Sequence, residues 1–277
     1  MDFTGKTIMV TGAGSGIGRA SAKVFAKAAM KVALCGRRLP LLEEAKREIE
    51  AEGGEAIAVA MDVQDEASVA GAVNRVLDTW GAIDVLFNNA GSFQHVGPMW
   101  EADPATWWHD VTVNLYGSFL CCRAVLPHMI ARNTGILINM DGGGSDTPNL
   151  GASSYACSKT ALLRLNEQIA IELRQVGSDV LVFGMNPGFV RTGMTEGLAA
   201  HEKGSQWQTF VGHLLERGEG FAPDDCGKAI LRLLSVASAE LSGRVFFVNT
   251  DFDEVDRCKG QIASEDRNVL RLRKDAP

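Results

Sequence analysis

The sequence predicts an α/β protein with a Rossmann-type doubly wound parallel sheet of about seven strands and helices on both faces. Short β-branched runs alternate with longer amphipathic stretches, which is typical of strands and crossover helices in a parallel sheet. The runs are apolar throughout instead of alternating with polar residues, as in strands that are covered on both sides. Right-handed crossovers between such strands then give the doubly wound order.

The expected elements follow one another in strict alternation for most of the chain. Strands are expected at Thr7 to Thr11, Lys31 to Cys35, Ala56 to Ala60, Ile83 to Phe87, Gly135 to Met140, Val180 to Gly184 and Arg244 to Val248. Helical periodicity is found at Gly16 to Ala29, Pro40 to Glu52, Glu66 to Trp80, Pro104 to Ile130, Ser153 to Val176 and Pro223 to Val236. The stretch from Gly193 to Gly220 breaks this rhythm. Because it follows the carboxyl end of a strand, we expect a substrate lid there.

Composition and charge limit the partners and the location. The chain has 277 residues and a formal net charge of −7, which would repel phosphate backbones, so no nucleic-acid partner is expected. No apolar stretch approaches the roughly 20 residues that span a bilayer, and no signal peptide is recognised, so we expect a cytoplasmic protein without a membrane partner. The six cysteines form no CxxC pair and are expected to be packing residues, with no metal site.

A glycine-rich turn follows the first expected strand. It reads Thr11-Gly-Ala-Gly-Ser-Gly-Ile-Gly18 and runs directly into an expected helix. Glycines let the backbone turn tightly and approach a pyrophosphate, whose charge then lies at the helix N-terminus. Ile17 stands where a strict G-x-G-x-x-G pattern has its last glycine, and a plain structural turn is the alternative. The position between a first strand and a first helix favours dinucleotide binding.

The end of the second expected strand carries two arginines and no acid. In a dinucleotide-binding fold an acid here binds the ribose 2′-hydroxyl of NAD, whereas an arginine suits the 2′-phosphate of NADP. Arg37 and Arg38 could clamp that phosphate through charge-assisted hydrogen bonds, so the sequence favours NADP, with NAD possible. The alternative is a pair of solvated loop residues.

Tyr155 and Lys159 begin the expected helix at Ser153, and a spacing of four places both on one face. A phenol is a poor acid or base at neutral pH, because its reference pKa is near ~10. A neighbouring ammonium favours the phenolate and lowers that pKa, which suits general acid–base work. Taken alone, the pair also fits an ordinary surface helix.

Together these motifs resemble the short-chain dehydrogenase/reductase family along the chain to about Val248. The matching segments are Thr11 to Gly18, Asp62-Val63, Asn88-Asn-Ala-Gly91, Asn114, Tyr155-x-x-x-Lys159 and Asn186-Pro-Gly-Phe-Val-Arg-Thr192. The resemblance implies an NAD(P)-dependent oxidoreductase that transfers a hydride between a nicotinamide and a small-molecule carbonyl or alcohol. It implies that Tyr155 exchanges the proton, Lys159 lowers the tyrosine pKa and holds the nicotinamide ribose, and Asn114 anchors a water that links Lys159 to solvent.

The residues expected to bind the cofactor come from the turn, the arginine pair and the family motifs. They are Gly12, Ser15, Gly16, Ile17, Gly18, Arg37, Arg38, Asp62, Val63, Asn89, Ala90, Gly91, Tyr155, Lys159, Pro187, Gly188, Val190 and Thr192. Asn88 has the alternative of only tying strands together, and Pro187-Gly188 that of a simple turn.

One position departs from the family pattern. The family usually has a serine thirteen residues before the tyrosine, where its hydroxyl holds the substrate oxygen, but Gly142 stands there in Met140-Asp-Gly-Gly-Gly-Ser145. If the glycine run bulges, Ser145 could take that catalytic role, because glycine adopts unusual backbone angles freely. Otherwise a backbone amide or a water must hold the oxygen. The missing serine also supports an alternative function, a cofactor-binding sensor or scaffold without turnover.

The expected organisation is a single dinucleotide-binding and catalytic domain over 1–250, with the lid over 193–220 and a C-terminal extension over 251–277. The extension departs from the family and could cover the cleft or a subunit interface. The two long helices are expected to form a homodimer or homotetramer interface.

Overall fold

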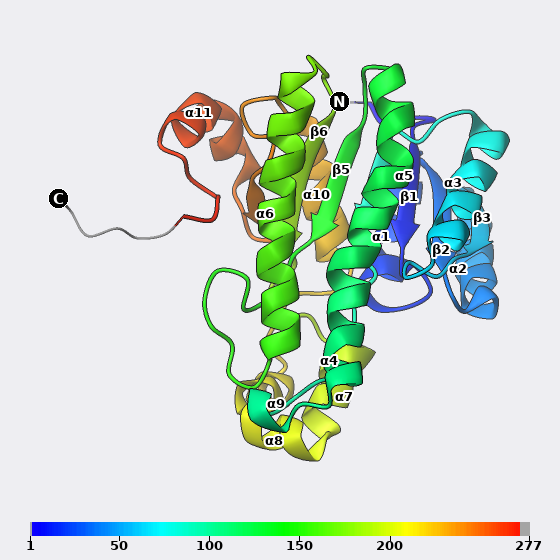
Figure 1. Ribbon diagram of the computed structural model, residues 1–277. Coiled ribbons are helices and arrows are strands. Elements are labelled where there is room, and N and C mark those ends of the chain that lie inside the picture. The colour runs from blue at the N-terminus through cyan, green and yellow to red at the C-terminus, as the bar shows by residue number, and fades with distance from the viewer. Residues whose placement is uncertain (1, 272–277) are drawn as a thin grey trace.

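A seven-stranded parallel sheet forms the centre of the protein, with strand order β3-β2-β1-β4-β5-β6-β7 (Figure 1). The computed structural model describes residues 2–271. The strands are β1 (Thr7–Thr11), β2 (Lys31–Gly36), β3 (Glu55–Ala60), β4 (Val85–Asn88), β5 (Ile136–Met140), β6 (Leu181–Asn186) and β7 (Val245–Phe247). The order reverses between β1 and β4, and open sheets of this kind bind ligands at the carboxyl ends of the strands beside such a reversal. The predicted fold class is confirmed.

Helices cover both faces of the sheet, as Figure 1 shows. One face carries α1 (Gly16–Lys27), α2 (Leu39–Ala51) and α10 (Asp225–Val236), and the other carries α3 (Glu66–Trp80), α5 (Gly117–Ala131) and α6 (Ser153–Gln175). Each face buries its own apolar cluster, with Phe25 and Ile230 in the first and Val125 in the second. Neighbouring residues of β1 divide between them, Ile8 in the first and Met9 in the second. This explains why the strand sequences are apolar throughout.

Apart from β1, whose bounds are as predicted, the predicted strands differ from the observed ones by one or two residues at their ends. β3 begins one residue earlier than expected, at Glu55, and β4 begins two residues later, at Val85. Shifts of this size are ordinary at the ends of secondary-structure elements, because the last backbone hydrogen bonds fray.

The helical stretch predicted from Pro104 to Ile130 is continuous but is not a regular α-helix throughout. It consists of α4 (Pro104–Val111), a π-helical turn (Thr112–Tyr116) and α5, which follow one another without a break. A short 3-10 helix (Met99–Glu101) precedes them. The π-turn contains Asn114, which is fully buried.

The stretch from Gly193 to Gly220 folds into three short helices, α7 (Gly193–Ala200), α8 (Glu202–Trp207) and α9 (Thr209–Arg217). They lie together at the end of the molecule toward which β1 and β5 point, drawn yellow in Figure 1. Leu198 of α7 and Val211 of α9 form a small apolar cluster with Val96, from the loop after β4. The 193–220 segment and that loop therefore pack against each other.

The part of the expected C-terminal extension within 251–271 is structured. It forms α11 (Phe252–Ser264), whose Phe252, Val255 and Ile262 join the core cluster of the first face. Residues 272–277 of the predicted extension lie outside the described residues. Within residues 2–271, none of the helices combines the length and apolar character that crossing a membrane requires.

Candidate active site

A cleft of about 600 Å³ lies at the carboxyl ends of the strands, within the range typical of cofactor and ligand sites. Most of the predicted site residues line it, namely Gly12, Ser15, Gly16, Ile17, Arg37, Arg38, Asp62, Val63, Asn89, Ala90, Gly91, Tyr155, Lys159, Pro187 and Thr192. Residues that the sequence reasoning missed also line it, among them Gly36, Leu42, Met61, Gln64, Val113, Met140, Asp141, Gly193 and Met194. Segments from the two halves of the sheet thus converge on one elongated site.

Other predicted site residues do not line the cleft, namely Gly18, Asn114, Ser145, Gly188 and Val190. A Cβ atom on Gly18 would lie 2.5 Å from the side-chain Nδ2 atom of Asn89, so this glycine lets the Asn89 side chain pack closely against the turn. Gly188 has φ +64° and leaves room for Phe221, which would lie 2.7 Å from a Cβ there. Val190 forms an isolated parallel bridge with the same Phe221. Gly18, Gly188 and Val190 therefore support the walls of the cleft without lining it.

The glycine-rich turn leads directly into α1. Gly12 and Gly16 have φ values of +67° and +54°, which glycine adopts without the strain that other residues incur. Ser15 is the N-cap residue of α1 and makes no side-chain capping bond, and the first turn holds no acidic residue. The amide groups there and the positive end of the helix dipole suit an anion.

The two arginines stand beside this turn. Arg37 and Arg38 line the cleft, and the Arg38 Nη2 atom donates a hydrogen bond of 3.1 Å to the Ser15 hydroxyl. Asp62, across the cleft at the end of β3, accepts a hydrogen bond of 3.0 Å from the Gln64 amide. The structure therefore gathers positive charge where the sequence predicted a phosphate contact.

Tyr155 and Lys159 both come from the first turns of α6 and line the other end of the cleft. The Lys159 Nζ atom donates a 2.7 Å hydrogen bond to the Met140 carbonyl and lies 5.6 Å from the centre of the Tyr155 ring. Burial lowers the pKa of Lys159 from 10.5 to about 8, partly offset by the carboxylate of Asp141. Burial raises the pKa of Tyr155 well above its usual value, and the charges of Asp141 and Asp110 act in the same direction. The phenol is therefore neutral at physiological pH in the free protein.

Asn114 holds the loop after β4 against α6. Its Oδ1 atom accepts a 2.8 Å hydrogen bond from the Ser92 amide, and its Nδ2 atom donates to the Ser92 carbonyl at 2.9 Å. The same Nδ2 atom donates to the Ser158 hydroxyl at 3.0 Å. Because Ser158 donates in turn to the Tyr155 carbonyl at 2.7 Å, Asn114 is connected to the catalytic candidate through one side chain.

Among the described residues, no group of three or more His, Cys, Asp or Glu side chains is arranged to hold a metal ion. In a comparison with known protein families, the short chain dehydrogenase family model matches residues 6–203.

The chain belongs to the short-chain dehydrogenase/reductase family. Short chain dehydrogenase mpl6 of Monascus purpureus is 32% identical over 274 residues, which cover 97% of this chain and 89% of that protein. Oxidoreductase UcpA of Escherichia coli (strain K12) is 36% identical over 198 residues, 71% of this chain and 74% of UcpA. As a member of this family, the protein is an oxidoreductase.

Solved structures of the family align over nearly the whole chain. A short chain dehydrogenase/reductase from Burkholderia phymatum, in complex with NAD, aligns with a TM-score of 0.79 at 24% identity and covers 99% of both chains. A protein from Beutenbergia cavernae with bound NADP at low occupancy aligns with a TM-score of 0.75 at 32% identity, covering 90% of this chain and 97% of that one. The first of these shows likeness of fold alone.

The absence of the usual family serine has a visible result at Gly142. A Cβ atom built there would lie 2.2 Å from the Tyr155 hydroxyl oxygen, so the phenol occupies the space that a serine side chain would take. The Phe93 ring stacks on the Tyr155 ring, with centroids 4.6 Å apart and an interplanar angle of 20°. Phe93 also packs against the apolar cluster of Val96, Leu198 and Val211. Tyr155 thus contacts both Phe93 and the glycine loop.

The structure places Ser145 beside Asp141. The Ser145 hydroxyl is buried and donates a 2.8 Å hydrogen bond to Asp141 Oδ2. A catalytic role for Ser145 stays a prediction, and Asp141 is the polar side chain of this loop that lines the cleft. Asp141 belongs to the Met140 to Ser145 stretch noted in the sequence, but no motif marked it as a site residue.

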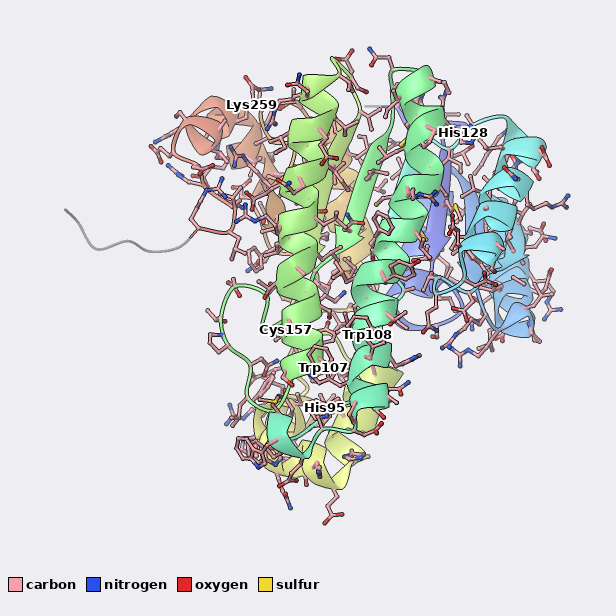
Figure 2. The ribbon with its side chains drawn as sticks, in the orientation of Figure 1. His95, Trp107, Trp108, His128, Cys157 and Lys259 are labelled. Atoms are coloured by element: carbon pink, nitrogen blue, oxygen red, sulfur yellow. The ribbon has the colours of Figure 1, made fainter. Side chains whose placement is uncertain are left out.

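Asp110 of α4 is a second residue that the sequence reasoning missed. It is fully buried and accepts hydrogen bonds from the Ser92 hydroxyl at 2.6 Å, the Ser154 hydroxyl at 2.7 Å and the His95 amide at 3.0 Å. His95 is buried as well and lies with Trp107 at the end of the molecule that carries α7 to α9 (Figure 2). Asp110 therefore fixes the loop after β4 to the start of α6. Its position four residues before Asn114, on the same helical face, is the signal that could have identified it.

Proposed function

We propose that the protein transfers a hydride between the nicotinamide of NADP(H) or NAD(H) and a carbonyl or alcohol carbon, with Tyr155 as proton donor and acceptor. The observation that carries the proposal is the meeting of Tyr155 and Lys159 with the glycine-rich turn in a single cleft. Structural relatives with NAD and with NADP support a nicotinamide dinucleotide as the cofactor.

The residues of the cleft fit such a dinucleotide. The uncapped N-terminus of α1 suits its pyrophosphate, and Asp62 with Val63 would contact the adenine. Arg37 and Arg38 favour NADP, because a guanidinium pairs with the 2′-phosphate and no acidic side chain stands at the end of β2 to bind a free 2′-hydroxyl. When bound, the nicotinamide supplies the hydride in reduction and accepts it in oxidation.

The chain's own residues handle the proton. The neutral Tyr155 phenol donates its Oη proton to the carbonyl oxygen in reduction, and the phenolate takes that proton back in oxidation. The Lys159 ammonium, held in place by the Met140 carbonyl, stabilises the phenolate once it forms. Asn114 holds the first turns of α6, which carry Tyr155, against the loop after β4. By resemblance to the family, it also anchors the water that links Lys159 to solvent.

Replacing the phenol hydroxyl tests this assignment. Tyr155→Phe should lower kcat by the ~10² to 10⁴ typical of a lost general acid and leave cofactor affinity nearly unchanged. Tyr116→Phe is the matched control, because Tyr116 is the chain's other tyrosine and is exposed. NADPH oxidation over a panel of carbonyls, together with calorimetric cofactor binding, measures both effects. A Tyr155→Phe enzyme with more than half of the wild-type turnover, with chemistry rate-limiting, would rule the role out.

A cofactor-binding protein without turnover is the second candidate, favoured by the missing serine at position 142. In that case the wild type would quench cofactor fluorescence and yet oxidise no NADPH with any carbonyl or alcohol tested. Turnover by the wild type excludes this candidate.

We also propose a homo-oligomer in the cytoplasm. Large apolar side chains are exposed along the helical run from α4 to α5, with Trp108 at 64%, Tyr116 at 44% and Phe119 at 40%. Exposed apolar side chains along two consecutive helices support association between copies of the chain. Figure 2 shows Trp108 on that run.

A further inference from the structure

Asp141 is a buried carboxyl group whose two oxygen atoms differ in their hydrogen bonds. Oδ2 accepts hydrogen bonds from the Ser145 hydroxyl at 2.8 Å and from the Asn186 side-chain amide at 3.2 Å. Oδ1 is buried and has no hydrogen-bond partner among residues 2–271. Buried polar atoms are nearly always paired in folded proteins, so an unpaired one on a residue that lines a cleft calls for a hydrogen-bond partner.

The difference between the two oxygens indicates where a proton would reside. With two donors, Oδ2 resembles the carbonyl oxygen of a neutral carboxylic acid, which leaves Oδ1 as its hydroxyl. Burial raises the pKa of Asp141, and the lowering effects of the Gly142 amide, Ser145, Lys159 and Asn186 offset this only in part. A neutral carboxylic acid is a hydrogen-bond donor, whereas a carboxylate only accepts.

Asp141 lies close to the reacting groups. It lines the same cleft as Tyr155 and Lys159, and in its ionised form it raises the pKa of both. It immediately precedes Gly142, against whose backbone the Tyr155 hydroxyl rests. The site therefore lacks a hydroxyl at position 142 and holds a carboxyl group one residue earlier.

We propose that Asp141, as a neutral acid, donates a hydrogen bond from Oδ1 to the substrate oxygen and so takes the part that the family gives to the missing serine. This inference rests on the proposed function. Ser145 and Asn186 are positioning residues, because their hydrogen bonds to Oδ2 orient the carboxyl group. The sequence-based candidate Ser145 thus acts through Asp141.

The chemistry requires no proton transfer from Asp141. Tyr155 alone gives its proton to the substrate oxygen while the hydride reaches the carbon, and the O–H bond of Asp141 stays intact. Its donor shares the negative charge that develops on the oxygen, and losing one such donor reduces rates by ~10² to 10³ in other oxyanion sites. A carboxyl group kept neutral in an apolar environment is a known way to provide such a donor.

The surrounding charges give the sign of the pH dependence. Lys159 of α6 is the charged group that acts on Asp141, and it opposes protonation. The partners from β6 and from the 142–145 loop are neutral, and Asp110 of α4 acts on Tyr155. As pH rises through the raised pKa of Asp141, the donor is lost, so carbonyl reduction should decline in that pH range.

Asp141→Asn is the decisive variant. Asn186 offers only a donor to Oδ2, so the new asparagine must turn its oxygen there and its amide group toward the Oδ1 position. We expect Asp141→Asn to keep kcat within about tenfold of wild type and to remove the decline in reduction with rising pH. Asp141→Ala should lower kcat by ~10² to 10³. Cofactor affinity should stay unchanged in both, and Asp146→Asn, exposed in the same loop, is the matched control.

Infrared spectroscopy of the free protein tests the protonation state without turnover. At the pH where carbonyl reduction is fastest, the carbonyl stretch of a neutral carboxylic acid should be present in wild type and Asp146→Asn and absent in Asp141→Asn. Its absence from wild type overturns the proposal, as does an Asp141→Asn variant that binds cofactor but is as slow as Asp141→Ala. Wild-type kcat in a folded Asp141→Ala variant also overturns it. An inactive wild type that retains the band refutes the proposed function instead, and with it the catalytic half of this proposal.

Discussion

Adding one methyl group at position 142 should impair the enzyme through the position of Tyr155. The Cβ atom of Gly142→Ala would lie 2.2 Å from the Tyr155 hydroxyl oxygen and 2.9 Å from Cζ, whereas ordinary contacts begin near 3.4 Å. The phenol oxygen must therefore move by about 1 Å, and Phe93 restricts it from the face on which it stacks. A misplacement of about 1 Å can reduce a rate by 10²-fold, and overpacking of this kind typically costs about 1–3 kcal/mol of stability.

The control for this variant is one residue away. A Cβ atom on Gly143 would meet nothing closer than 3.9 Å, so Gly143→Ala adds the same methyl group to the same loop without crowding Tyr155. We expect kcat for carbonyl reduction to fall on the order of 10²-fold in Gly142→Ala and to stay near wild type in Gly143→Ala. Steady-state NADPH oxidation and thermal unfolding of both variants measure these effects. Equal activity of the two would show that the observed position of the tyrosine is not the one used in catalysis. A serine at 142 would face the same crowding, although the family pattern has one there.

Two further predictions concern the cofactor and the buried lysine. Arg37→Ala removes a charge-assisted hydrogen bond worth ~1.5 to 3 kcal/mol, so calorimetry should show NADPH binding ~10 to 150-fold weaker with NADH little changed, and exposed Arg47→Ala is the control. Equal wild-type affinity for NADH and NADPH would instead assign NAD. Burial lowers the pKa of Lys159 from 10.5 to about 8, so the unfolded chain binds more protons between these values. The free energy of unfolding of wild type relative to Lys159→Met should thus rise by up to about 3 kcal/mol as pH increases from 8 to 10.5, and change little below 8 or above 10.5. Denaturant unfolding of both proteins in this range checks the difference, and a constant value would contradict the burial argument.

The predictions from sequence succeeded where a signal is local and repeated. Strands buried on both faces, such as β1, leave uninterrupted apolar runs that need no knowledge of their neighbours. The glycine-rich turn and the Tyr155–Lys159 spacing are equally local. They line one cleft because the carboxyl ends of parallel strands meet at one edge of the sheet.

The features that sequence reasoning missed depend on contacts between distant segments. Asp141 becomes distinctive only once Asn186, 45 positions away, occupies one of its oxygens. The π-turn at Thr112–Tyr116 contains no glycine or proline that would mark it in the sequence, so a single long helix is predicted there. By contrast, α11 had a readable signal, since Asp251 caps the amides of Asp253 and Glu254 in a D-x-x-E pattern.

The π-turn between α4 and α5 also makes the site sensitive to a particular kind of genetic change. A π-turn accommodates one extra residue inside an α-helix. The side chains of the flanking helices therefore point in the same directions as they would in one regular helix that lacked that residue. Asn114 lies within this turn, whereas the core residue Val125 of α5 and the 3.0 Å bond from Trp107 to Ser153 lie outside it. Loss of a single codon here would restore a regular helix and leave both flanks packed, while breaking the hydrogen bonds of Asn114. Under the proposed function, such a deletion is expected to lower turnover while the fold and the glycine-rich turn stay intact.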